Sequence, residues 1–208
     1  MRKPMFKFLL ALLLLSCVSQ AMVVQADNGK QRTYKMPAYK SSFIVSPEVY
    51  KKAADYYATN YKKLSKRDKF VIIDFSLHAS KPRLLYLDIA NKSFTTHLVS
   101  AGAGSDPDGD GYATKFSNTS DSKMSSLGAY LTLKTYTGKY GYSLYLKGLD
   151  STNDNAEKRA IVMHPASYVS EANKHAGRSW GCPAVDPLIS RDLIDNIKDG
   201  VIIFVATK

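Results

Sequence analysis

Short apolar runs rich in β-branched and aromatic residues dominate the centre of the chain. They cover 70–75, 83–89 and 94–99, and the breaks between them hold Lys81-Pro82 and Asn91-Lys92. Runs of this length bounded by turn residues are typical of antiparallel strands. The pattern therefore predicts a meander of three strands, and similar runs predict further strands at 129–134, 143–146, 160–163 and 201–205.

Apolar residues at helical spacing flank these strands on both sides. Ser46-Pro47-Glu48 starts the first helix, because serine is a good N-cap and proline suits the first helical position. Its apolar face is Val49, Ala53, Tyr56, Tyr57, Tyr61 and Leu64. Asp186-Pro187 starts the second helix, which Asp199-Gly200 ends. We predict a mainly β domain at 65–208 with flanking helices, preceded by a helix at 46–64 and a polar linker or arm at 27–45.

The first 26 residues have the pattern of a secretory signal peptide. Arg2, Lys3 and Lys7 precede an apolar core that is too short to span a bilayer, and Val24-Gln25-Ala26 fits a cleavage site. A lipid anchor at Cys17 is the alternative, but Leu15 fits poorly before such a cysteine. Both alternatives predict an exported protein of the periplasm or cell envelope, without a membrane span.

The chain is basic, with a net charge of +11, or +8 once the three cations of the signal are removed. A basic surface attracts polyanions, and for an exported protein the cell wall is such a polymer. We expect no nucleic-acid partner, because no nucleic-acid-binding motif accompanies the charge and the lysines are spread along the chain.

Cys182 is the one cysteine beyond the signal segment, and it lies between Gly181 and Pro183. A cysteine in a glycine-containing turn favours chemistry over packing, since the backbone there can approach a ligand closely. The thiolate is the nucleophile, and a free thiol with a pKa of about 8.5 needs a base near neutrality. His164 ends an apolar run and suits that role, whereas His175 lies in a polar loop.

Several spaced motifs carry a resemblance to a known family. The spacing from His164 to Ser179-x-Gly181-Cys182 resembles the catalytic motif of the L,D-transpeptidases. Over about residues 70–206 the chain resembles the murein L,D-transpeptidase catalytic domain family, through these segments: Phe116-Ser117-Asn118, Ser125-Ser126-Leu127-Gly128, Tyr136-Thr137-Gly138-Lys139, Ser143-Leu144, Gly148-Leu149-Asp150, 159–166 and 177–185. The resemblance implies a β-sandwich or open-barrel domain with a cysteine nucleophile and no metal or cofactor.

The same resemblance implies acyl transfer between peptidoglycan stem peptides by a protein that we expect to be a monomer. Cys182, deprotonated by His164, would form a thioester that an amine resolves, with backbone N–H groups at Gly181 forming an oxyanion hole. Nearby cations, His164, Lys174 and Arg178, are expected to lower the thiol pKa.

The remaining site residues are assigned with alternatives. Ser179 would orient His164, or act only as a turn hydroxyl. Arg178 would bind a substrate carboxylate, or remain a solvated charge. Trp180 would form a groove wall, and Asn118 is assigned to substrate binding. Better-known members have histidine at the position of Trp180 and arginine or asparagine at that of Ala184, so those polar contacts are not carried over.

Three rival interpretations remain at this stage. The same dyad with water as acceptor gives an L,D-carboxypeptidase or amidase, and a chain without turnover would be a wall-binding protein. A papain-like protease is disfavoured, because there the cysteine precedes the histidine.

The segment 106–111 imitates a calcium loop, but Ser117 stands where an EF-hand has its last glutamate, so an exposed turn is favoured.

Overall fold

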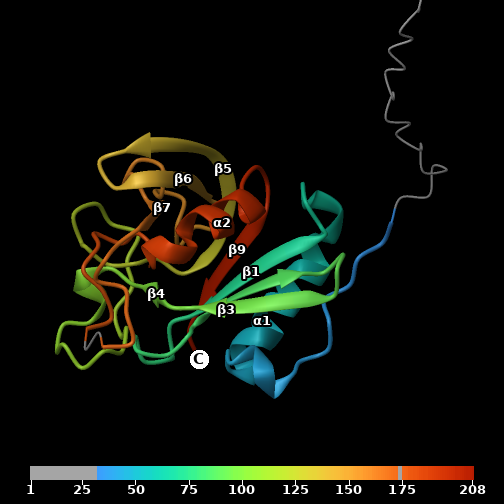
Figure 1. The fold of residues 1–208 in the computed structure, drawn as a ribbon, viewed down its shortest axis with the longest axis horizontal. Helices are drawn as coiled ribbons and strands as arrows, with labels where there is room; N and C mark the ends of the chain where they lie inside the picture. The colour runs from blue at the N-terminus through green and yellow to red at the C-terminus, as the bar shows by residue number, and fades with distance from the viewer. Residues whose placement is uncertain (1–31, 173–174) are drawn as a thin grey trace, which may run out of the picture. The chain divides into compact units, whose positions relative to one another are not determined.

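A single sheet organises the unit Tyr34–Lys208. The computed structural model describes residues 32–172 and 175–208, and within them nine strands pair in the order β3-β2-β1-β9-β5-β6-β7-β8-β4 (Figure 1). The strands are β1 (Lys69–Asp74), β2 (Leu84–Asp88), β3 (Ser93–His97), β4 (Val99–Ser100), β5 (Gly128–Gly138), β6 (Gly141–Gly148), β7 (Val162–Pro165), β8 (Ala184–Val185) and β9 (Ile202–Ala206). The predicted signal segment 1–26 and Cys17 lie outside the described residues.

Two pairings in this sheet join distant parts of the chain. The predicted β1–β2–β3 meander is antiparallel, and β9 then pairs parallel to β1, with Phe70 opposite Ile202. Beyond the β5–β6 hairpin, β7 and β8 are also parallel, with His164 opposite Ala184. This second pairing brings the segment of the predicted base beside the segment of the predicted nucleophile.

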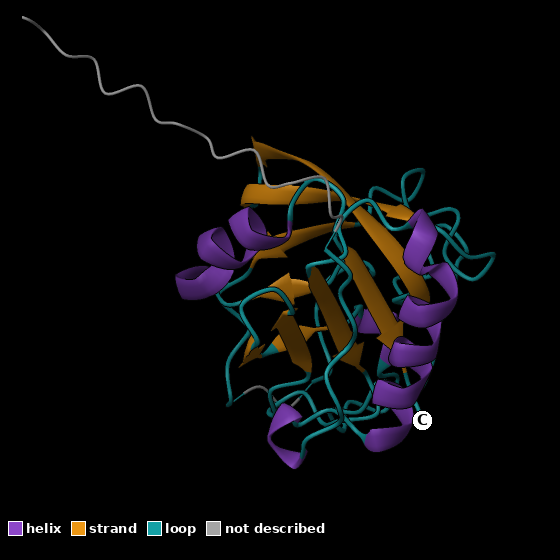
Figure 2. Ribbon diagram, turned by 90° about the vertical axis from the view of Figure 1, so that its right-hand side faces the viewer, coloured by secondary structure: helices purple, strands orange, loops and turns teal. Residues whose placement is uncertain are grey.

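Both faces of the β1–β2–β9 region are buried, which explains why these strands are continuous apolar runs. Phe70 and Ile72 pack on one face against helix α1 (Pro47–Asn60), whereas Val71 and Ile73 belong to the core that helix α2 (Pro187–Ile197) covers. Figure 2 shows helices on both sides of the strands. The prediction of a mainly β domain with flanking helices is confirmed.

The caps of both helices follow from the sequence. The Oγ of Ser46 accepts the N–H of Val49 at 3.4 Å, and the carboxylate of Asp186 accepts the N–H of Leu188 at 2.8 Å. After α1 the chain continues in the short 3₁₀ helix η2 (Tyr61–Lys63). Among the described residues, no helix combines the length and the apolar character needed to cross a membrane.

Three features differ from the sequence-based expectations. Phe43, in the 3₁₀ helix η1 (Ser41–Phe43), and Val45 fall in the predicted polar linker yet are 1% exposed, because they pack against α1 and the sheet. The β5–β6 hairpin is longer than predicted, since its strands continue to a tight turn at 139–140. β7 includes Pro165, because its pairing with β6 covers only Val162 and Met163, so proline's missing N–H removes no bond to that neighbour.

The acidic turn at 106–111 brings carboxylate oxygens of Asp106, Asp108 and Asp110 within 4.8 Å of one another. Asp106 is buried, and its oxygens accept the N–H groups of Asp110, Gly111 and Ala176. These bonds fold the turn and tie it to the segment that leads to Cys182. A further 3₁₀ helix, η3 (Ala103–Ser105), precedes this turn.

Candidate active site

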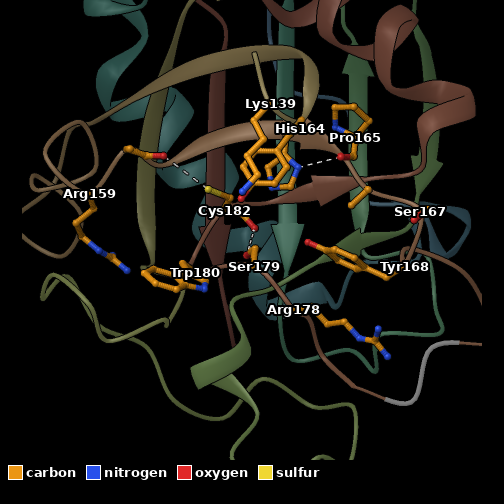
Figure 3. Close-up of a pocket in the computed structure, with 13 residues that line it drawn as sticks. Lys139, Arg159, His164, Pro165, Ser167, Tyr168, Arg178, Ser179, Trp180 and Cys182 are labelled. Carbon is orange, nitrogen blue, oxygen red and sulfur yellow. Dashed lines mark hydrogen bonds between the residues drawn. The ribbon is translucent and has the colours of Figure 1, made fainter. Parts of the chain in front are cut away.

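Cys182 and His164 line one cavity of about 690 Å³ (Figure 3). Its wall comes from the β5–β6 turn, the end of β7, the segment after β7 and the turn before β8. The lining residues are Lys139, Tyr140, Arg159, Ala160, His164, Pro165, Ala166, Ser167, Tyr168, Arg178, Ser179, Trp180 and Cys182. Within this described lining there are three permanent cations and no acidic side chain, so the cavity favours an anionic ligand.

The thiol of Cys182 is held by the backbone that precedes and begins β7. Its sulfur accepts the N–H of Val162 at 3.5 Å, and its S–H donates to the carbonyl of Ala160 at 3.7 Å. Burial raises the pKa of the thiol, while the N–H of Val162 and the charge of Arg159 act in the opposite direction. The expectation that His164, Lys174 and Arg178 lower this pKa is therefore wrong, because the cation that acts on the thiol is Arg159 and desolvation outweighs it; Lys174 lies outside the described residues.

His164 is buried at the end of β7, under the turn of the β5–β6 hairpin. The ring of Tyr140 stacks on its imidazole at 4.7 Å between centroids and 28° between planes. Nδ1 lies 2.9 Å from the carbonyl of Pro165, which can only accept, so Nδ1 carries the proton and Nε2 holds a free lone pair. Burial lowers the pKa of His164, and the bond to Pro165 partly opposes this shift. The imidazole is therefore neutral near pH 7.

The two side chains share the cavity without bonding to each other. Among the hydrogen bonds of the described residues, none joins His164 to Cys182. The thiol donates to the carbonyl of Ala160. Figure 3 shows His164 directed away from the thiol, to Pro165. Proton transfer between them requires the S–H bond to rotate away from Ala160.

Ser179 and Gly181 build the turn that carries the nucleophile. The Oγ of Ser179 donates to the carbonyl of Cys182 at 2.7 Å and accepts the N–H of Gly181 at 3.2 Å. Ser179 therefore stabilises its own turn, and within the described residues it makes no bond to His164. Gly181 has φ of +122°, and a Cβ there would lie 2.6 Å from the carbonyl oxygen of Met124. Only glycine fits this position.

Arg178 and Trp180 both lie at the cavity, and both are exposed. Trp180 is 64% exposed, and the ammonium of Lys123 lies 5.0 Å from its ring centroid. Arg178 has no hydrogen-bond or ion-pair partner among the described residues. Figure 3 shows Arg178 and Arg159 on opposite sides of Cys182, with Trp180 between them.

Asn118 lies outside the cavity lining. Its Nδ2 donates to Asp154 Oδ1 at 2.6 Å and to the carbonyl of Ser151 at 3.1 Å, and its Oδ1 accepts the N–H of Asn155. The side chain thus joins two loops. Because Asn118 is absent from the lining of the cavity, we assign it no contact with substrate there.

Two residues of the site were not singled out from the sequence. Arg159 donates to the carbonyls of Ser117 and Met124 and lies close enough to Cys182 to affect its pKa. Tyr140 covers His164. Tyr140 lies between Gly138 and Gly141, which is a usable signal for a turn that forms a groove wall, but nothing in the sequence pairs it with His164.

Comparison with protein-family models matches residues 42–206 to the L,D-transpeptidase catalytic domain. No curated protein matches the chain. Among solved structures, an L,D-transpeptidase from Mycobacterium smegmatis is 12% identical over 67% of this chain and 58% of that chain, with a TM-score of 0.42. One from Mycobacterium tuberculosis is 12% identical over 67% and 57%, with a TM-score of 0.43. One from Stackebrandtia nassauensis is 16% identical over 74% and 64%, with a TM-score of 0.42.

This chain spans less than two thirds of the length of each of these three proteins. The family match, in contrast, covers most of the chain and includes both His164 and Cys182. The chain belongs to the L,D-transpeptidase catalytic domain family.

Proposed function

We propose that the protein is an exported L,D-transpeptidase that modifies peptidoglycan through a thioester on Cys182. The observation that carries the proposal is one cavity lined by the half-buried thiol of Cys182 and by His164, whose Nδ1 bonds the carbonyl of Pro165 and leaves Nε2 to accept a proton. The family supports the reaction class. The basic lining of the cavity fits a substrate with carboxylates, such as a peptidoglycan stem peptide.

The proposed reaction has two acyl transfers. The thiol proton of Cys182 passes to Nε2 of His164 while the sulfur bonds to the carbonyl carbon of the L-residue in a stem tetrapeptide. The C–N bond to the terminal D-amino acid then breaks, and the imidazolium returns its proton to the leaving nitrogen. An acceptor amine next attacks the thioester and releases the thiol.

Burial of the thiol makes the neutral pair, rather than a thiolate–imidazolium pair, the resting state in this proposal. The base then has to remove the proton during attack, which is general-base catalysis. The N–H of Val162, 3.5 Å from the sulfur, is positioned to stabilise the thiolate as it forms. The same N–H assists the second acyl transfer, in which the sulfur of Cys182 is the leaving group.

The oxyanion in this scheme is bound by the backbone of the nucleophile turn. The N–H of Gly181 already donates to Ser179, so we assign the oxyanion to the N–H of Cys182, which has no partner among the described residues. A preorganised donor of this kind typically contributes about 3–4 kcal/mol to the transition state.

Recognition of the stem peptide is assigned to the exposed cations. Arg178 has no partner among the described residues, and its planar guanidinium suits a carboxylate in two-pronged geometry, while Lys139 supplies a second charge on the β5–β6 turn. The exposed ring of Trp180 offers an apolar wall of the same cavity. Arg178→Gln should therefore raise KM for the stem peptide with a smaller effect on kcat.

The products of one incubation test the proposal. The mature protein is incubated with a stem tetrapeptide, with and without a second stem carrying a free amine, and the peptides are weighed by mass spectrometry. A transpeptidase gives a joined product that Cys182→Ala does not make. A shortened stem alone, with no joined product, would replace the proposal by an L,D-carboxypeptidase. No change in either peptide would favour a wall-binding protein.

A further inference from the structure

Ser125 lies under the nucleophile turn and is buried, being 2% exposed. Its Oγ donates to the carbonyl of Gly181 at 3.1 Å and accepts the N–H of Gly102 at 3.0 Å. Because the hydroxyl has one proton, the bond from Gly102 leaves that proton to Gly181. The direction of this short relay is thereby fixed.

The carbonyl of Gly181 and the N–H of Cys182 belong to the same peptide group. No peptide bond among the described residues is cis, so the two groups point in opposite directions. A hydroxyl that holds the carbonyl on the buried side therefore turns the N–H of Cys182 away from Ser125. Hydrogen bonds in a chain also polarise one another, which makes this N–H a stronger donor.

The position of Ser125 is itself fixed by its neighbours. Its N–H donates to the Oγ of buried Ser105 at 2.9 Å, and Arg159 binds the carbonyl of the preceding residue, Met124. The φ of +122° at Gly181 is a conformation that the turn can adopt only with glycine. The hydroxyl of Ser125 thus holds the peptide group between Gly181 and Cys182 from the buried side. Gly181 has no side chain that could fix the orientation of this peptide group.

We propose that Ser125 is a positioning residue for acyl transfer, which orients the N–H of Cys182 toward the developing oxyanion. The inference rests on the proposed function and adds a role for a serine that neither the thiol nor the imidazole touches. Ser125 acts only through the backbone of the turn.

The test compares two reactions of the same thiol. Thioester formation with a stem tetrapeptide passes through an oxyanion, whereas alkylation of Cys182 by iodoacetamide does not. Ser125→Ala should slow thioester formation by about 10- to 100-fold, less than the 10²–10³ typical of losing an oxyanion donor outright. It should leave alkylation within about 2-fold of the wild type, and KM nearly unchanged.

Ser126→Ala is the matched control. Ser126 is equally buried, but its hydroxyl bonds to Tyr130 at 2.6 Å and to Arg159 at 3.3 Å instead of to the nucleophile turn. The Ser126→Ala variant should lose about as much stability as Ser125→Ala and keep the wild-type rate of thioester formation. Ser125→Cys keeps the shape with a much weaker donor, and it takes the place of Ser125→Ala if that variant does not fold.

The outcomes separate this inference from the proposed function. A wild-type protein that forms no thioester on Cys182 contradicts the proposed function itself. A wild type that acylates, together with Ser125→Ala or Ser125→Cys acylating at the same rate, overturns the role of Ser125 alone. Equal slowing of acylation and alkylation also overturns it, because the serine would then only support the fold of the turn.

Discussion

Arg83 is the buried charge on which the segment before the nucleophile depends. Its side chain is fully buried and donates to the carbonyls of Leu77 at 2.9 Å, Val99 at 2.8 Å and Ala176 at 2.7 Å. Burial lowers the pKa of Arg83 to about 10, with Asp106 and Asp74 opposing the shift. Ala176 lies six residues before Cys182, so this guanidinium joins the sheet to the active-site segment.

Replacing Arg83 by methionine keeps the volume roughly and removes all three bonds. Ala176 retains a second donor, the N–H of Ala101 at 2.7 Å, so the loss falls mainly on the carbonyls of Leu77 and Val99. A charged hydrogen bond contributes about 1.5–3 kcal/mol, and the variant regains the cost of burying the cation. The net loss should be about 3–5 kcal/mol of unfolding free energy.

Thermal unfolding measures this loss. For a domain of this size about 1 kcal/mol corresponds to roughly 2–4 °C, so Arg83→Met should lower Tm by on the order of 10 °C. Arg191→Met is the control, since that exposed guanidinium lies 4.3 Å from the ring centroid of Tyr142, a contact worth about 0.5–1 kcal/mol. A Tm for Arg83→Met equal to or above that of the wild type would refute the reasoning, because burial of the cation would then cost more than its bonds return.

Three further predictions concern the imidazoles and the nucleophile turn. His164→Ala should lower kcat by about 10²–10⁴, while His175→Ala should have a mild effect. Because burial lowers the pKa of His164, the acid limb of the wild-type kcat/KM profile should lie below pH 6.5. Burial lowers the pKa of His97 as well as that of His164, so as pH falls these histidines are protonated in the unfolded chain before they are protonated in the folded protein. Tm should therefore fall as pH drops below about 6.5, and a flat Tm from pH 7 to 5 would contradict this. Gly181→Ala should abolish thioester formation in a folded protein, since its Cβ would meet the carbonyl of Met124 at 2.6 Å; near-normal acylation rates would argue against the rigid turn.

The sequence was sufficient for the elements that local chemistry specifies. The Ser46 and Asp186 caps set the starts of the two helices, and continuous apolar runs marked strands buried on both faces. Phe43 was missed, because its burial depends on packing against α1 and not on its polar neighbours. Local pattern contains no information on such long-range packing.

In the candidate site, too, local features could be predicted from the sequence and long-range contacts could not. The spacing of His164 and Cys182 was visible in the sequence, whereas the parallel pairing of β7 with β8 that brings their segments together was not. Arg159 lay in the segment 159–166 that carries the family resemblance but was given no role, because its place beside Cys182 depends on a loop 35 residues earlier that folds back to its guanidinium. The predicted direction of the pKa shift of the Cys182 thiol was wrong, because the burial of a thiol cannot be judged from the glycine and proline beside it in the sequence.

The central claim is that Cys182 is acylated by the stem peptide with His164 as base. The most direct measurement is intact mass of the mature protein during turnover, followed by peptide mapping of the modified residue. The account predicts a thioester on Cys182 that forms slowly in His164→Ala, disappears when an acceptor amine is added, and is absent from denatured protein. An acyl group found elsewhere in the chain, or turnover of the stem peptide by Cys182→Ala, would contradict it.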